Sequence, residues 1–195
     1  MKKIITCLFA ISTIAITACG NNNNGAGTTN NKSTAAMPAM HIIPVNTTQS
    51  TTTIKEIIGA YLQLKNAFTE DNSTDAASAG KSLFAAFTNF DTKTLSPEQI
   101  KTFNDIADDA KEHVEHIGAN SGNIKHQREH FVMLSKDISD LIKMLGNGGQ
   151  TLYKDFCPMA NDGKGAIWIS ETKEIKNPYL GKSMPACGTV KEEIK

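Results

Sequence analysis

Through most of the chain, apolar residues recur at steps of three and four, with polar residues between them. This spacing places the apolar side chains on one face of an α-helix. Four such stripes follow one another, and they begin at Ile54, Ala76, Ile100 and Ile124. Four amphipathic helices joined by short connections predict an antiparallel four-helix bundle, which we place at residues 52–149.

Capping and turn residues mark the ends of these predicted helices. Ser96, Pro97 and Gln99 form a strong start signal, because serine caps a helix, proline favours its first position and glutamine completes a capping box. Residues 118–123 are expected to form a loop. The glycine-rich run at 146–149 ends the fourth helix, since glycine readily adopts the conformations that terminate helices.

The pattern changes after the last of these glycines, where short apolar runs typical of strands alternate with stretches typical of turns. The strand-like runs are residues 151–153 and 166–169, and the turn-like stretches are residues 161–163 and 177–181. We therefore expect a small irregular β unit at residues 150–192, packed on the bundle and anchored by the single tryptophan, Trp168. The predicted fold class is mainly α, with this C-terminal β unit added.

The first 18 residues have the organisation of a secretory signal peptide, with two lysines followed by an apolar stretch at 4–16. A membrane-spanning helix needs about 20 apolar residues, so this stretch is too short to be one. It ends in the sequence ITAC, which resembles the lipobox of bacterial lipoproteins and implies cleavage before Cys19 and lipidation of its thiol. By similarity to Gram-negative sorting rules, Gly20 in place of an aspartate implies an outer-membrane anchor in the cell envelope.

Residues 19–51 are rich in asparagine, glycine, threonine and serine and have little to bury, so we expect a disordered tether. Within it lie Met37, Met40 and His41. Two thioethers and an imidazole suit a soft ion such as Cu(I), which would make this a secondary, weak metal site. The alternative is a chance cluster in a disordered tail.

Composition and charge exclude several classes of function. The 195 residues carry 20 Lys and Arg against 20 Asp and Glu, whereas a nucleic-acid-binding protein usually shows a basic excess. The sequence contains no Gly-x-Ser-x-Gly elbow, phosphate-binding loop or dinucleotide fingerprint. We therefore expect a non-enzymatic protein whose partners do not include nucleic acid.

Several motifs of the second half resemble a known family. They are QREHF at 127–131, CPMA at 157–160, GAxWxS at 165–170 and EIxNPYxGKxMxxCG at 174–188. The pattern is similar to that of a family of envelope domains of unknown function, found as lipoproteins and also fused to the periplasmic adaptor subunits of heavy-metal efflux pumps. The resemblance covers about residues 55–192. It implies an accessory role in heavy-metal efflux, with efflux components as partners.

A second similarity, to a short heavy-metal-binding module, suggests a site for a soft metal. The chain keeps Cys157 and Met159 of its Cys-Pro-Met motif and Cys187 of its Cys-Gly pair, but has Met184 where the module has a cysteine. Two thiols and two thioethers are donors that Cu(I) prefers. We expect His130 to be the additional donor from the bundle.

The two C-terminal cysteines also allow a structural interpretation. Once Cys19 is lipidated, Cys157 and Cys187 are the thiols left in the mature chain, and in an oxidising envelope such a pair is most simply a disulfide. Closing a loop of about 30 residues adds roughly 3–4 kcal/mol of stability. The protein would then be a non-catalytic structural or interaction module. Both interpretations stay open, and they exclude each other because a disulfide offers no thiolate ligands.

Four histidines form two pairs on the third and fourth predicted helices. His113 and His116 are three residues apart, and His126 and His130 are four apart, so each pair shares one face of its helix. On a helical wheel, His113 and His130 border the apolar stripe while His116 and His126 point outward. We expect surface histidines on solvated faces, except His130. A di-iron site would need Glu-x-x-His on two helices, and neither helix has it.

Overall fold

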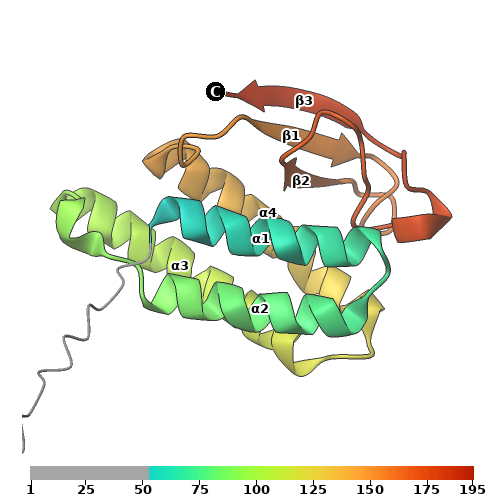
Figure 1. Ribbon diagram of the computed structural model, residues 1–195, viewed down its shortest axis with the longest axis horizontal. Coiled ribbons are helices and arrows are strands. Elements are labelled where there is room, and N and C mark those ends of the chain that lie inside the picture. Colours follow the sequence, from blue (N-terminus) through green and yellow to red (C-terminus); the bar gives the residue numbers. More distant parts are fainter. Residues whose placement is uncertain (1–52) are drawn as a thin grey trace, which may run out of the picture. The chain divides into compact units, whose positions relative to one another are not determined.

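The computed structural model describes residues 53–195, and it contains four helices and a small sheet (Figure 1). The predicted signal peptide, the lipidation site Cys19 and the tether with Met37, Met40 and His41 lie outside the described residues. Within residues 53–195, no helix has both the length and the apolar character needed to cross a membrane.

The four predicted helices are present, and consecutive helices reverse direction (Figure 1). They are α1 (Ile54–Thr69), α2 (Ser73–Thr88), α3 (Pro97–Ala119) and α4 (Ile124–Leu145), with a short 3-10 turn, η1 (Thr92–Thr94), between α2 and α3. Each helix packs against the next one along the chain, and α4 also contacts α1. The prediction of a helical bundle is confirmed.

The helix ends follow the sequence signals, with one correction. Ser96 caps α3 as predicted, and Gln99 completes the capping box. The loop predicted to begin at residue 118 begins later, because α3 continues to Ala119. Gly118 is helical and allows close packing on α2, since a Cβ atom there would lie 3.2 Å from Cγ of Lys81. This glycine therefore marks a helix contact and not a turn.

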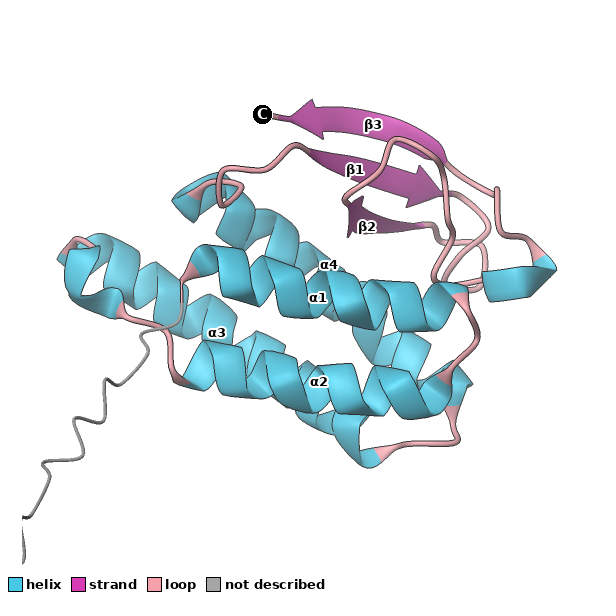
Figure 2. Ribbon diagram, viewed as in Figure 1, coloured by secondary structure: helices cyan, strands magenta, loops and turns pink. Residues whose placement is uncertain are grey.

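The C-terminal unit is a three-stranded antiparallel sheet that lies over one side of the bundle (Figure 2). Its strands are β1 (Leu152–Cys157), β2 (Ala166–Ser170) and β3 (Thr189–Ile194), in the order β2-β1-β3. A further 3-10 turn, η2 (Gly181–Ser183), precedes β3. β3 is not predicted from the sequence, because this edge strand is mostly exposed and polar and has no apolar alternation.

Aromatic side chains fill the space between sheet and bundle. Trp168 is fully buried, as predicted. The Phe131 ring of α4 stacks on Tyr61 of α1 at 5.3 Å and lies 5.5 Å from Tyr179, which precedes η2. The Tyr61 hydroxyl accepts a hydrogen bond from the backbone nitrogen of Ile169 in β2, at 3.1 Å. The sheet is thus bound to the bundle by both apolar and polar contacts.

We predict that Phe131→Ala lowers the free energy of unfolding by about 3–5 kcal/mol, because it opens a cavity among the rings that join sheet and bundle. Met133→Ala, at an exposed position of the same helix, is expected to change it by less than about 0.5 kcal/mol. Urea unfolding of both variants measures the difference. Equal losses would contradict the assignment of Phe131 to the core.

Candidate metal centre

Four histidines gather where the end of α3 faces the beginning of α4. The rings of His116 and His130 are stacked, with centroids 4.3 Å apart and planes 5° from parallel. The His126 ring lies 4.7 Å from that of His130. One nitrogen from each of these three residues lies within 4.8 Å of the other two. Among residues 53–195, this is the one such group of three or more histidine, cysteine or acidic side chains, and it can hold a metal ion.

The helical hairpin explains why the two histidine pairs meet. The turn between α3 and α4 reverses the chain, so residues at equal distances from the turn face each other. His116 and His126 lie three to four residues from the turn at 120–123, and His113 and His130 lie seven residues from it. His116 is exposed, as expected, but the other three rings are half-buried. The expectation of surface histidines on solvated faces missed this convergence, although the symmetric spacing about the turn was a signal for it.

The buried side chain of Gln127 holds this turn together. Its amide nitrogen donates to the carbonyl oxygens of Ile117, at 2.9 Å, and Ser73, at 3.0 Å, and its amide oxygen accepts from the Ser73 hydroxyl at 2.7 Å. The Ile117 carbonyl belongs to the last turn of α3, where the helix supplies no partner. The Ser73 hydroxyl also accepts from the backbone nitrogen of Gly122, at 2.7 Å. One side chain therefore joins the ends of three helices beside the histidines.

Two of the half-buried histidines, His113 and His130, favour the neutral form. Burial lowers the pKa of both His113 and His130 below the ordinary histidine value, and the neighbouring His116 acts in the same direction on both. The acidic side chains of Glu112 and Asp109 oppose this shift in the pKa of His113. A metal ion binds only an unprotonated ring nitrogen. A histidine with a lowered pKa can therefore bind an ion at a lower pH than a solvated histidine can.

Three imidazoles with an open coordination position are a ligand set for Zn(II), Cu(II) and related ions. In a tetrahedral site with metal–nitrogen bonds of about 2.0–2.1 Å, the ligand nitrogens lie about 3.3 Å apart. The exposed ring of His116, which is stacked on that of His130, must therefore turn so that one nitrogen of each ring faces a shared ion. The exposure of His116 gives its ring the freedom to do so.

The two predicted thiols also come together, at a different place in the fold. Cys157 is buried at the end of β1, and Cys187 is half-buried just before β3. Their Sγ atoms are 2.8 Å apart and both thiols are free. The hydrogen bond between them raises the pKa of Cys187. Contact between the sulfurs is required both for a disulfide and for a shared ion, so it favours neither interpretation.

The other predicted ligands of the soft-metal site are Met159, Met184 and His130, and they lie in two different regions of the fold. Met159 and Met184 lie on turns of the C-terminal unit, where they are 55% and 39% exposed. Met159 lines a cavity of about 270 Å³ beside α4. His130 lies in the histidine cluster, and within the described residues no group of this kind joins a histidine to both thiols. His130, the expected additional donor, therefore belongs to the hairpin of α3 and α4 and not to the thiol pair.

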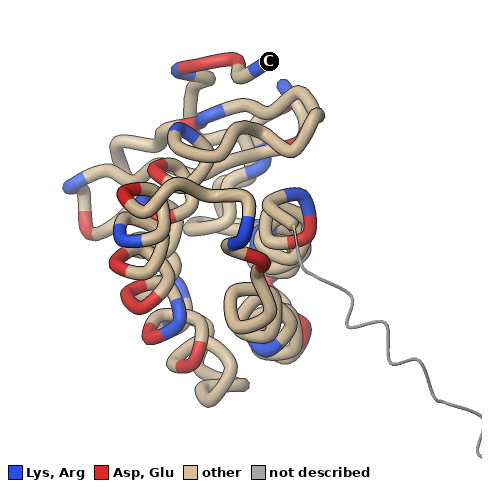
Figure 3. The backbone as a smooth tube through the Cα atoms, turned by 90° about the vertical axis from the view of Figure 1, so that its left-hand side faces the viewer, with Lys and Arg blue, Asp and Glu red and all other residues tan. Residues whose placement is uncertain are grey.

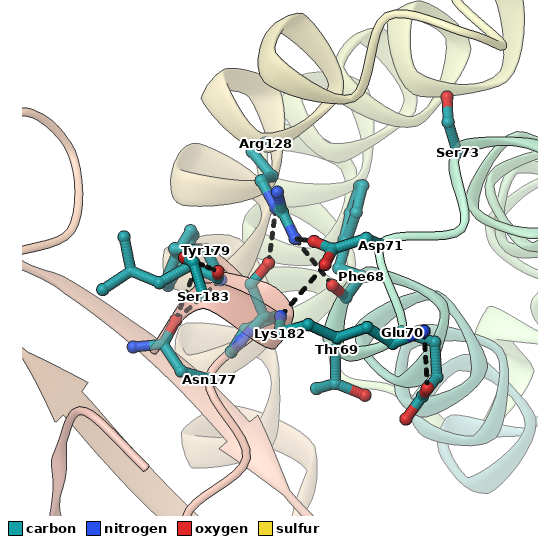
Figure 4. A network of polar contacts seen from close by, with 12 residues as sticks. Phe68, Thr69, Glu70, Asp71, Ser73, Arg128, Asn177, Tyr179, Lys182 and Ser183 are labelled. Atoms are coloured by element: carbon teal, nitrogen blue, oxygen red, sulfur yellow. Dashed lines mark hydrogen bonds and ion pairs between the residues drawn. The ribbon is translucent and has the colours of Figure 1, made fainter. Parts of the chain in front are cut away.

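A polar clamp around Arg128 fixes the C-terminal unit on the bundle (Figure 4). Arg128 of α4 donates to the carbonyl oxygens of Pro178 and Phe68, at 2.7 Å each, and pairs with Asp71 at 2.6 Å. The other Asp71 oxygen accepts from the backbone nitrogen of Lys182, at 3.0 Å. Arg128 therefore links α4 to the α1–α2 corner and to the segment around η2.

Other residues of the C-terminal motif support the same arrangement. The buried amide of Asn177 accepts from the backbone nitrogen of Tyr179, at 2.8 Å, and donates to the carbonyl of Cys187, at 2.6 Å. Gly181 has a φ of 53°, and a Cβ atom there would overlap the Asp71 carboxylate. These residues shape the turn that seats the C-terminal unit on the helices.

Residues 57–150 match a family described as a protein of unknown function, DUF3347. The matched stretch contains all four clustered histidines and ends before β1, so the C-terminal motifs lie outside it. No curated protein and no solved structure matches the chain. The match agrees with the resemblance seen in the sequence in one respect, because both point to a family of unknown function.

We predict that Gln127→Ala lowers the free energy of unfolding by about 1–3 kcal/mol, because it leaves the buried Ile117 carbonyl without a partner. Gln63→Ala removes the same side chain from an exposed position of α1 and is expected to cost much less. Chemical denaturation of the two variants provides the comparison. If both lose the same stability, Gln127 does not hold the hairpin.

Proposed function

We propose that this protein is an accessory of the cell envelope that binds a transition-metal ion, and that copper is the favoured ion. The convergence of His116, His126 and His130 carries this proposal. Each ligand comes from a rigid helix, and the helices are joined by a turn with buried polar contacts. Because the backbone positions of the ligands are held in this way, the reordering on ion binding is confined to side chains.

The chemistry of the donors supports copper. Imidazole nitrogens bind divalent ions of intermediate softness, and Cu(II) binds most strongly in the first-row series. The thiol pair of Cys157 and Cys187, when reduced, offers the sulfur ligands that Cu(I) prefers. The described part of the chain thus offers donors for both oxidation states of copper, at two places in the fold.

The charge of α3 is also favourable for a cation. This helix carries six acidic residues and two lysines, and its C-terminal half includes His113 and His116 (Figure 3 marks the charges). A negative potential near a site raises the local concentration of cations and their association rate. The acidic helix therefore supports capture of a metal ion at the hairpin.

The envelope location and the efflux role rest on the sequence. The lipobox resemblance at Cys19 supports an anchor in the outer membrane, with the folded part held on the tether. The resemblance to domains fused to efflux adaptors supports heavy-metal efflux components as partners. In this proposal the protein binds the ion near the membrane and passes it to those components without catalysing a reaction.

The proposal predicts one tightly bound Cu(II) or Zn(II) ion per chain, measured by titration against a chromophoric chelator. The sample is the mature chain with Cys19→Ser, produced without residues 1–18. His116→Ala and His126→Ala should each weaken binding at least about tenfold. Loss of a residue that only supports a metal ligand already lowers metal affinity by about 10–100-fold, and loss of the ligand itself should cost no less. His41→Ala is the matched control, because it removes the histidine of the predicted tether. Unchanged affinity in both cluster variants, or a loss confined to His41→Ala, would overturn the proposal.

A second candidate function is a structural or interaction module with a Cys157–Cys187 disulfide, and the 2.8 Å contact between the sulfurs permits that bond as well as a shared ion. It predicts that the untreated protein is lighter by two hydrogens than the reduced protein. It also predicts that Cys157→Ser and Cys187→Ser lose equal stability. A Cu(I) competition titration of the reduced protein separates the alternatives: tight binding that is lost in Cys157→Ser and weakened in Met184→Leu would favour the soft-metal site.

A further inference from the structure

Two of the clustered histidines, His126 and His130, each contact a neighbouring side chain through their Nδ1 atom. Nδ1 of His126 lies 3.3 Å from a carboxylate oxygen of Glu129. Nδ1 of His130 lies 3.2 Å from Nδ1 of His113. In both histidines of α4, the nitrogen that remains for an ion is therefore Nε2.

The Glu129 contact determines the position of a proton on His126. A carboxylate has no proton to donate, so Nδ1 of His126 must carry the hydrogen in this contact. In the neutral ring the other nitrogen, Nε2, then has a free lone pair. This is the less common tautomer of histidine in water, where Nε2 usually carries the hydrogen.

The contact between His113 and His130 also requires one donor and one acceptor. Two neutral rings joined through their Nδ1 atoms can form the hydrogen bond only if one of them carries its hydrogen on Nδ1. When Nδ1 of His130 donates, its Nε2 is free to bind an ion and His113 is the acceptor. His113 itself lies outside the group of three whose nitrogens are mutually within 4.8 Å.

We propose that Glu129 and His113 are positioning residues that hold His126 and His130 in the Nδ1–H tautomer, so that both present Nε2 to the metal ion. The inference rests on the proposed function. Metal-binding histidines generally donate their second ring nitrogen to a carboxylate or another acceptor, which fixes the ring and strengthens the ligand. The alternative for Glu129 is an ordinary surface pair one helical turn apart, without any effect on the ion.

The first test uses the metal-free protein and does not depend on metal binding. In the ¹⁵N-labelled mature chain with Cys19→Ser, long-range ¹H–¹⁵N correlation spectra identify which ring nitrogen carries the hydrogen, at a pH where the rings are neutral. We expect Nδ1–H for His126 and His130. Glu129→Ala should return His126 to the common Nε2–H form, and His113→Phe should do the same for His130.

The second test measures the affinity for Zn(II) in matched variants. Glu129→Ala should lose about 10–100-fold in affinity, as expected for removal of such a partner. Glu129→Gln, which keeps an acceptor oxygen but no charge, should stay closer to the wild type. Glu115→Ala removes the same charge from an exposed position of α3 and is the control for electrostatic attraction. For His113, the Asn variant keeps an acceptor near the Nδ1 position and should retain more affinity than His113→Phe.

The outcomes separate this inference from the proposed function. If His126 or His130 of the metal-free wild type carries its hydrogen on Nε2, the inference is overturned whatever the protein binds. If Glu129→Ala and Glu115→Ala lose affinity equally, Glu129 acts through its charge and the inference is again overturned. If the wild type binds no ion, the proposed function fails, and the positioning role for an ion fails with it. The inference is supported if the spectra show the hydrogen on Nδ1 of both histidines and if Glu129→Ala and His113→Phe lose Zn(II) affinity while their controls do not.

Discussion

The hydrogen bonds of Gln127 are the constraint on which the histidine cluster depends. The last carbonyls of α3 lack helical partners, and burying one of them without a hydrogen bond would be costly. Gln127 satisfies the Ile117 carbonyl from α4 and at the same time bonds Ser73 at the start of α2. The relative positions of α3 and α4 are thereby fixed at the level where His116 and His126 face each other.

Arg128, the next residue of α4, directs a second set of contacts to a different face of the helix. Its hydrogen bonds join the α1–α2 corner and the segment before β3, and Asp71 is shared between the two. Adjacent residues on a helix point about 100° apart, so one short run of α4 can hold the hairpin and the sheet together. Residues 127–131 thus have four roles in one short segment. Gln127 holds the hairpin and Arg128 forms the clamp, while His130 belongs to the histidine cluster and Phe131 to the core.

The fold could be predicted from the sequence because its signals are local. The apolar stripes, the Ser96 cap and the terminal glycines define helices without knowledge of their neighbours. β3 escaped prediction because its pairing with β1 depends on a partner over thirty residues away. The histidine cluster was missed because spacing within each helix was considered alone, whereas the reversal at the turn decides which faces of α3 and α4 meet. Gly118 illustrates the ambiguity of glycine, which serves equally in a turn and in a close helix contact.

The differing exposure of the three candidate ligands has an energetic consequence. His126 and His130 are half-buried and hydrogen-bonded, so their rings are largely ordered before an ion arrives. His116 is exposed and must lose side-chain freedom on binding, which costs about 0.5–1.5 kcal/mol for a mobile side chain. A site with two fixed ligands and one mobile ligand can open without unfolding either helix. This arrangement agrees with the proposed function, because a protein that passes its ion onward needs a site that opens more readily than a permanent structural one.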